Sequence, residues 1–292
     1  MDREQRLVER FEADRPHLRA VAYRLLGSLS EADDALQDAW VRASRADIAA
    51  VENLSGWLTT VVTRVCLNLL RARGARREEP LDTWEPGTEL PDGVDPEQEA
   101  LTADAVGVAL LVVLDALTPA ERVAFVLHDM FAVPFDDIAP MIERSPAATR
   151  QLASRARRRV RGAAPAPEAD LTRQREVVAA FLAATRAGHF ASLLSLLDPD
   201  VVLRADAMVV PTPQPVTLRG AEIVAESALA AVGRAGFAGL ALLDGAVGVV
   251  MAPFGRLRLV LAFTVVADRV TEIEVIAEPE RLRRIDLVAL DA

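Results

Sequence analysis

Cysteine, lysine and histidine are scarce in this sequence. Its 292 residues include one cysteine, three histidines and no lysine, so all 33 basic residues are arginine. Cys66 alone cannot form an internal disulfide, and one thiol with three imidazoles cannot supply a cysteine-rich zinc site. These shortages indicate a reducing, cytoplasmic environment, and we expect neither a metal site nor a cofactor.

Long hydrophobic runs are also missing, although 51% of the residues are apolar. The longest run, 105–114, is about half of the ~20 residues that a membrane span needs. The N-terminal segment is charged from its second residue, unlike a signal peptide. We therefore expect no signal peptide and no membrane helix, in a chain long enough for about two domains.

Acidic residues outnumber basic ones, and the formal charge of −10 speaks against nucleic-acid binding by the molecule as a whole. The charge is unevenly distributed, however. Residues 78–99 contain nine acids and no arginine, whereas the arginine-rich stretches 64–77 and 144–161 contain no acid. Because salt screens surface charges beyond ~8 Å, each arginine cluster can bind a polyanion on its own.

Two segments without apolar periodicity divide the chain. The acidic, Pro- and Gly-containing segment 78–99 and the short segment 163–169 are predicted linkers. They separate two blocks with helical periodicity, 1–77 and 100–162, from a mixed block, 170–292. In the mixed block we expect helices over 172–187 and 220–232 and strands over 200–205, 238–243, 246–251, 257–266 and 270–277.

An amphipathic helix is predicted over 57–77. Arg64, Asn68 and Arg71 fall on its outer, basic face. Its inner face consists of apolar residues at helical spacing, namely Leu58, Val61, Val62, Val65 and Leu69.

Capping patterns mark two further helix starts. Ser30 with Asp33 predicts the start of a helix that ends near Ala43, and Thr118 with Glu121 predicts a capping box with Pro in the first turn.

A helix-turn-helix is predicted over 134–161. Its second helix starts at Ser145-Pro146, after a turn near Glu143. The inner stripe of this helix is Thr149, Leu152, Ala156 and Val160, and its outer stripe is Arg150, Ser154, Arg157, Arg158 and Arg161, flanked by Gln151 and Arg155. Such a helix fits the major groove, where Arg reads guanine and Gln reads adenine. An ordinary solvated amphipathic helix is the alternative.

The segments 22–43, 57–78, 117–139 and 145–160 together resemble the extracytoplasmic-function (ECF) sigma factors of bacterial RNA polymerase. The whole chain is most similar to the sigma-J type, which carries a C-terminal SnoaL-like domain. This resemblance implies two all-α sigma domains, the second with a helix-turn-helix, followed by an α+β NTF2-like cone domain, and it implies no enzymatic activity. Three departures from the family pattern stand out: Asn68 replaces a frequent Asp, Glu143 replaces a frequent Gly, and Pro140 lies inside the expected first helix of the motif.

The resemblance also assigns roles to surface residues and names core RNA polymerase and promoter DNA as partners. It places polymerase binding on Asp33, Asp34, Gln37, Asp38 and Trp40, although Trp40 fits a core position equally well. It places −10 recognition on Arg64, Asn68, Arg71, Arg73 and Arg76. It places −35 recognition on Arg150, Gln151, Ser154, Arg155, Arg157 and Arg158.

In the sigma-J type the C-terminal domain regulates the sigma factor in cis. We expect its contact surface here to include Asp206, Glu278, Pro279, Glu280 and Arg281. Whether this domain also binds a small-molecule ligand, and which one, stays open. The acidic linker 78–99 either threads the RNA path of polymerase or is a solvated spacer.

Two other functions are considered. One is a ligand-sensing helix-turn-helix regulator, and the other is a SnoaL-like cyclase or isomerase that uses Asp206 and His189 for proton transfer.

Overall fold

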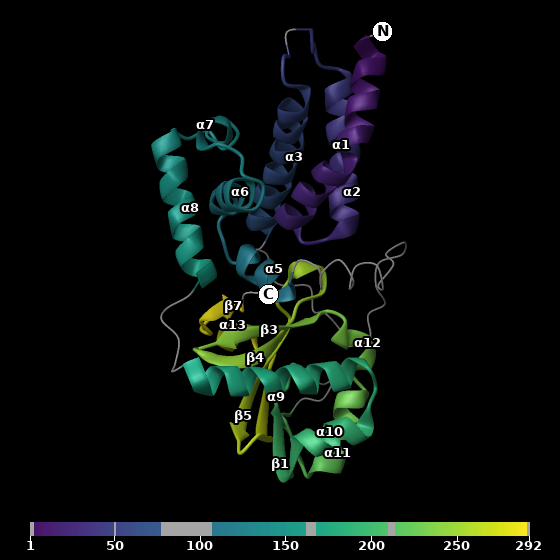
Figure 1. The fold of residues 1–292 in the computed structure, drawn as a ribbon, viewed down its shortest axis with the longest axis vertical. Coiled ribbons are helices and arrows are strands. Elements are labelled where there is room, and N and C mark those ends of the chain that lie inside the picture. The colour runs from purple at the N-terminus through teal and green to yellow at the C-terminus, as the bar shows by residue number, and fades with distance from the viewer. Residues whose placement is uncertain (1–2, 50, 77–106, 162–167, 210–213, 291–292) are drawn as a thin grey trace. The chain divides into compact units, whose positions relative to one another are not determined.

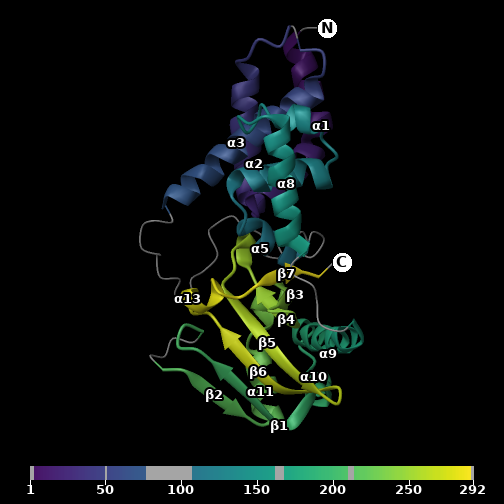
Figure 2. The ribbon, with the colours of Figure 1, turned by 90° about the vertical axis from the view of Figure 1, so that its left-hand side faces the viewer.

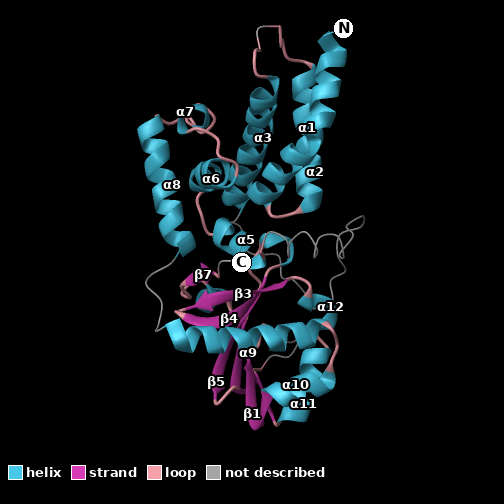
Figure 3. Ribbon diagram, in the orientation of Figure 1, coloured by secondary structure: helices cyan, strands magenta, loops and turns pink. Residues whose placement is uncertain are grey.

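The chain folds into two compact units (Figure 1). The computed structural model describes residues 3–49, 51–76, 107–161, 168–209 and 214–290. A helical unit combines the described residues up to 76 with 114–158, and an α+β unit combines 107–113 with the described residues from 159 onward. Figure 3 shows that every strand of the described residues belongs to the second unit, which confirms the predicted helical part followed by an α+β part. The predicted linker 78–99 and most of 163–169 lie outside the described residues.

Three long helices build the first part of the helical unit, and shorter helices build the rest. α1, α2 and α3 contact one another, and α3 also contacts α6. Helix α5, Val108–Asp115, crosses the division between the two units. The bounds are α1 Arg3–Leu26, α2 Leu29–Ser44, α3 Leu54–Arg76, α6 Pro119–Phe125, the π-helical turn η1 Val126–Met130, α7 Phe135–Ile138 and α8 Pro146–Arg161.

Helix α3 buries most of the stripe that its sequence predicts. Leu58, Val62 and Val65 are buried, but Leu69 is 37% exposed, so its assignment to the inner face was wrong. Leu70 and Cys66 are buried instead, because α3 packs against α6 as well as α1 and α2 and its buried face turns along the helix. Burial raises the pKa of the Cys66 thiol to about 12, so this thiol stays protonated and unreactive at neutral pH.

One predicted helix start is corrected and another is confirmed. Helix α2 begins two residues earlier than predicted, because Ser28 rather than Ser30 is its N-cap and accepts the backbone N–H of Glu31 at 3.5 Å. Gly27 ends α1 with a left-handed φ of 81°, so the next helix can start at once. The capping box at Thr118 is present, with Thr118 Oγ1 accepting the Glu121 N–H at 3.4 Å and Glu121 accepting the Thr118 N–H at 3.1 Å.

The turn of the helix-turn-helix explains two departures from the family pattern. Pro140 does not lie inside a helix, because α7 is a single turn that ends at Ile138. Glu143 adopts a φ of 56°, the left-handed region that glycine tolerates without strain. The frequent glycine at this position therefore has a backbone cause, and Glu143 carries a conformational cost.

Replacing Glu143 with glycine is expected to raise the free energy of unfolding of the helical unit by about 0.5–1 kcal/mol. The gain is the relieved left-handed strain less the greater entropy of glycine in the unfolded chain. Urea unfolding followed by circular dichroism measures it. Arg144, which is also exposed, is the control: replacing it with glycine should not stabilise the unit, and equal effects of the two changes would contradict the strain argument.

The α+β unit is a seven-stranded mixed sheet covered by helices. Its strand order is β2-β1-β6-β5-β4-β3-β7, with β1 and β6 parallel and every other pair antiparallel (Figure 2). The strands are β1 Leu197–Ala205, β2 Val216–Arg219, β3 Ala238–Leu243, β4 Ala246–Met251, β5 Leu259–Val266, β6 Arg269–Ile276 and β7 Leu287–Ala289. The helices are α9 Glu168–Arg186, α10 Phe190–Leu196, α11 Ala221–Leu229, α12 Val232–Ala235 and α13 Pro279–Leu282, with a 3₁₀ turn η2 Pro253–Gly255.

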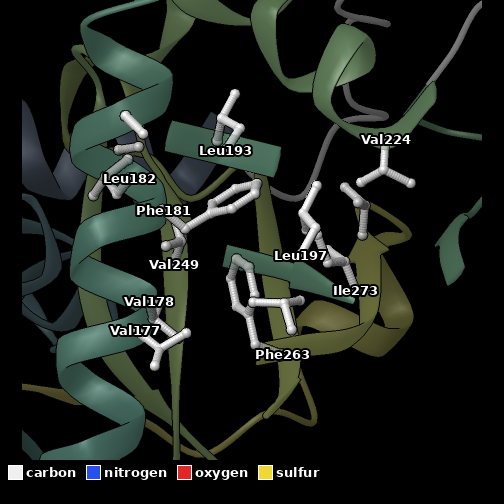
Figure 4. Close-up of a cluster of buried hydrophobic side chains, with 14 of the residues drawn as sticks. Val177, Val178, Phe181, Leu182, Leu193, Leu197, Val224, Val249, Phe263 and Ile273 are labelled. Atoms are coloured by element: carbon white, nitrogen blue, oxygen red, sulfur yellow. The ribbon is translucent and has the colours of Figure 1, made fainter. Parts of the chain in front are cut away.

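The core of this unit lies between the sheet and helices α9, α10 and α11. Figure 4 shows Phe181 of α9 and Phe263 of β5 meeting at its centre, with ring centroids 5.3 Å apart. Leu193, Leu197 and Ile273 are fully buried around them. Side chains therefore fill the space between the sheet and these helices.

Helix α5 approaches the sheet closely at one glycine. A Cβ atom on Gly239 of β3 would lie 2.9 Å from the Cβ of Val108, so only glycine fits there without displacing the helix. Residues 107–113 thus pack with the α+β unit, although the sequence groups them with 114–162. The predicted domain boundaries stay predictions.

Candidate nucleic-acid and polymerase interfaces

Helix α8 has the buried stripe and the exposed arginine stripe that a recognition helix needs. The Ser145 hydroxyl caps its N-terminus by accepting the Ala148 N–H at 3.2 Å. Thr149, Ala153 and Ala156 are completely buried. The predicted −35 residues Arg150, Gln151, Ser154, Arg155 and Arg158 are exposed, and Arg157 is half-buried.

Two of these arginines contact carboxylates of the same unit. Arg157 Nε lies 2.5 Å from Asp129 Oδ1, at the end of η1. Arg155 Nε lies 3.7 Å from the buried Glu121 carboxylate of α6. DNA phosphates would have to compete with these carboxylates for the same donors.

The outer face of α3 presents the predicted −10 residues in two different states. Arg64, Asn68 and Arg71 are exposed, and an Arg64 Nη donates to the Pro140 carbonyl at 3.4 Å. Arg73 is held inside the unit, since it forms an ion pair with Glu31 and donates to the Leu26 carbonyl at 3.0 Å. The side chain of Arg76 lies outside the described part of the chain.

The C-terminal carbonyls of α1 are satisfied by arginines from other helices. Arg122 of α6 is 4% exposed, donates from Nη1 to the Leu25 carbonyl at 2.9 Å, and pairs from Nη2 with Asp115 at 2.8 Å. Together with Arg73 on Leu26, it places two positive charges at the negative end of the α1 dipole.

A second contact between α1 and the region after α6 is aromatic. The Phe131 ring meets His17 edge-on at 5.3 Å, and the Arg24 guanidinium lies 5.2 Å from the same ring. No periodicity or motif predicts this contact or that of Arg122. One feature of the sequence does point to Arg122: together with Glu121 it places charge at the start of an otherwise apolar run, shortly after Thr118.

Helix α2 presents an exposed acidic face. Asp34, Gln37 and Asp38 are exposed, and the exposed Asp33 accepts two hydrogen bonds from Arg19 at 2.7 and 2.8 Å. Trp40 is half-buried against Phe11, with ring centroids 5.0 Å apart. Trp40 thus packs on α1 as well as bordering the surface.

A groove of about 250 Å³ runs beside this acidic face. The exposed Leu69 and charged side chains line it together. Its lining residues are Glu31, Asp34, Leu69, Ala72 and Arg73.

Asp206 joins the ends of two parallel strands in the α+β unit. It follows β1, whose last residue pairs with Val275 of β6. Its carboxylate accepts the backbone N–H groups of Met208 at 3.0 Å, Ala277 at 2.7 Å and Glu278 at 2.9 Å. The Asp206 carboxylate therefore fixes the backbone that leads into α13.

The remaining residues predicted for the regulatory surface lie in or next to α13. Arg281 pairs with Glu274 at 2.6 Å, and Glu280 pairs with Arg283 at 2.5 Å. The Glu274 carboxylate raises the pKa of Arg281. Glu278 and Glu280 are exposed, and Pro279 and Arg281 are half-buried. The structure thus brings together the five residues named for this surface, while their regulatory role stays a prediction.

Replacing Asp206 with alanine is expected to lower the free energy of unfolding of the α+β unit by about 2 kcal/mol. The change removes three hydrogen bonds to a charged acceptor, and the freed N–H groups lie close enough to solvent to recover part of the loss. Urea unfolding of the full chain measures the effect. The exposed Asp200, replaced with alanine, is the control, and equal effects of the two substitutions would contradict the role given to Asp206.

The geometry gives little support to proton transfer in this unit. An open hollow of about 550 Å³ lies between α9 and the turn after β5, and neither Asp206 nor His189 lines it. His189 is exposed in the turn before α10. Within the described residues, no helix is both long and apolar enough to cross a membrane.

The fold and the site define a class: a two-unit protein in which a helical unit with an exposed arginine face is joined to an α+β unit. Family models match the chain in two places, Sigma-70 region 2 over residues 10–76 and Sigma-70 region 4 over residues 107–160.

Two curated relatives come from Mycobacterium tuberculosis. The chain is 43% identical over 203 residues to ECF RNA polymerase sigma factor SigJ, a match that covers 68% of this chain and 65% of that protein. It is 37% identical over 199 residues to the probable ECF RNA polymerase sigma factor SigI, covering 68% of this chain and 69% of that protein. The crystal structure of M. tuberculosis SigJ aligns over 94% of this chain and 98% of its own, with 36% identity and a TM-score of 0.45.

The chain therefore belongs to the ECF family of RNA polymerase sigma factors. This membership confirms the resemblance found in the sequence and classes the protein with sigma factors, a family that is not enzymatic.

Proposed function

We propose that this sigma factor binds core RNA polymerase, directs promoter-specific transcription initiation in the cytoplasm, and is regulated in cis by its α+β unit. The observation that carries the proposal is helix α8, whose buried stripe of small residues backs an exposed stripe of arginines. Arginine donors match guanine edges and phosphates, and an exposed helix of this kind fits the major groove.

In this proposal α3 recognises the −10 element. Arg64, Asn68 and Arg71 present donors on one exposed face, suited to a single strand with an acidic backbone. Arg73 and Arg76 complete the set, and Arg73 must first leave Glu31 and the Leu26 carbonyl. The exposed face of α2, with Asp33, Asp34, Gln37 and Asp38, and the neighbouring Trp40 bind polymerase.

The α+β unit acts, in the same proposal, through the surface around Asp206 and α13. The ion pairs of Arg281 and Glu280 give this surface alternating charges that a partner of mixed charge can match. The acidic segment 78–99 serves either as a solvated spacer or as a mimic of a nucleic-acid strand, and reversing its nine charges distinguishes these roles.

The deciding measurement is the affinity of bacterial core RNA polymerase for the full chain and for a version that ends near Ala169. Tight binding by either establishes polymerase as the partner. The difference between the two affinities gives the sign and size of the control by the α+β unit, and equal affinities would contradict cis regulation of this step. Absence of binding by both would favour an independent DNA-binding regulator.

A further inference from the structure

Three side chains from three different elements form a stack at the start of the recognition helix. The His128 ring of η1 lies on the Phe135 ring of α7, with centroids 3.7 Å apart and 26° between the ring planes. The Arg150 guanidinium of α8 lies 5.8 Å from the centre of the Phe135 ring. His128 Nδ1 lies 3.0 Å from the Val133 carbonyl, which can only accept, so Nδ1 carries the proton and the ring is fixed.

This stack is more than ordinary core packing, because its outermost member is exposed. Arg150 is exposed and Phe135 and His128 are half-buried, so the rings support a charged group at the surface. Arg150 is the fifth residue of α8, near the N-terminal end from which recognition helices contact base edges.

Arg150 also differs from its neighbours in how it is held. The Asp129 carboxylate occupies a guanidinium donor of Arg157, and the Glu121 carboxylate attracts the charged guanidinium of Arg155. A ring face holds a guanidinium without using any N–H donor. Arg150 is held in this second way, which leaves its N–H fork for a guanine O6 and N7.

We propose that Phe135, supported by His128, is a positioning residue that sets base specificity at the promoter position read by Arg150. The inference rests on the proposed function, since it requires α8 to read the −35 element. An arginine side chain loses rotamer freedom when it binds a base, and a stacked guanidinium has already lost part of it. Removing the ring should therefore weaken both affinity and discrimination at one base position.

The test uses the full chain bound to core polymerase and a library of DNA duplexes randomised across the −35 window. Phe135→Leu is expected to lower affinity for the best-bound duplexes about fivefold, the loss of one exposed stacking contact. It should flatten base preference at a single position, the same one that Arg150→Lys flattens. Phe135→Trp keeps a ring face and should retain the preference, and Phe135→Leu should add little to Arg150→Lys.

Phe131→Leu is the matched control, because that ring lies in the same unit but contacts His17 and Arg24 of α1. It should leave the base preference unchanged. A uniform loss of affinity by Phe135→Leu, with discrimination intact, would show a merely structural ring and overturn the inference. The inference would also fail if Arg150→Lys lost base discrimination and Phe135→Leu kept it. If Arg150→Ala changes neither affinity nor preference, the −35 reading by Arg150 in the proposed function fails instead.

Discussion

Reversing Asp34 and Asp38 to arginine is expected to weaken binding of core RNA polymerase at least 100-fold. The two carboxylates lie one helical turn apart on the exposed face of α2. If polymerase meets this face with basic residues, reversal replaces two attractions with two like-charge contacts, which cost several kcal/mol in an interface. Titrating labelled core polymerase with the wild-type and variant chains measures the change.

A matched control exists in the α+β unit. Glu222 and Glu226 are also one turn apart and exposed, on helix α11. Reversing them changes the net charge of the protein by the same amount, so it reports any general electrostatic effect on association. Equal weakening by the two double variants would contradict a specific polymerase surface on α2. The salt dependence should also differ, because a specific ion-paired face loses affinity more steeply with salt.

Local patterns predicted most of the helices and strands of this protein. All five strands expected in the C-terminal block are present, and most of their ends lie within two residues of the predicted ends. The capping box of α6 and the N-cap of α8 were readable from three or four letters. These features depend on neighbours in the sequence. The short strands β2 and β7 and the single turns α12 and α13 were missed, since each is defined by pairing or packing with distant segments.

The candidate sites show the same division. The periodicity of α8 placed its arginines on one exposed face, as the structure has them. It could not show that Arg157 contacts Asp129 or that Arg150 rests on Phe135, because those partners come from other elements. The periodicity of α3 likewise predicted Leu69 as buried, whereas the groove beside α2 exposes it.

Long-range contacts also decide which arginines are available to DNA. Counting arginines in the sequence gives every guanidinium the same weight. In the structure, however, Arg73 forms an ion pair with Glu31 and a hydrogen bond to the Leu26 carbonyl. Arg64, by contrast, is exposed and makes one long hydrogen bond to Pro140. Fewer guanidinium groups of each cluster are therefore open to a polyanion in this conformation than its formal charge indicates.

Replacing Arg122 with methionine is expected to lower the free energy of unfolding of the helical unit by about 3 kcal/mol. Methionine keeps the length of the stem but leaves the Leu25 carbonyl and the Asp115 carboxylate without their donor. Removing one partner of a buried ion pair costs about 3–5 kcal/mol, and Asp115, whose side chain is 20% exposed, recovers part of this through water. Urea unfolding followed by circular dichroism measures the loss.

The exposed Arg158, replaced with methionine, controls for the loss of one positive charge from the same unit and should change stability by at most about 0.5 kcal/mol. Arg122→Lys separates charge from geometry. An ammonium keeps the charge but lacks the planar fork that serves the Leu25 carbonyl and Asp115 together, so this variant should fall between methionine and wild type. Stability of Arg122→Met equal to that of Arg158→Met would mean that α6 is held to α1 by apolar packing alone.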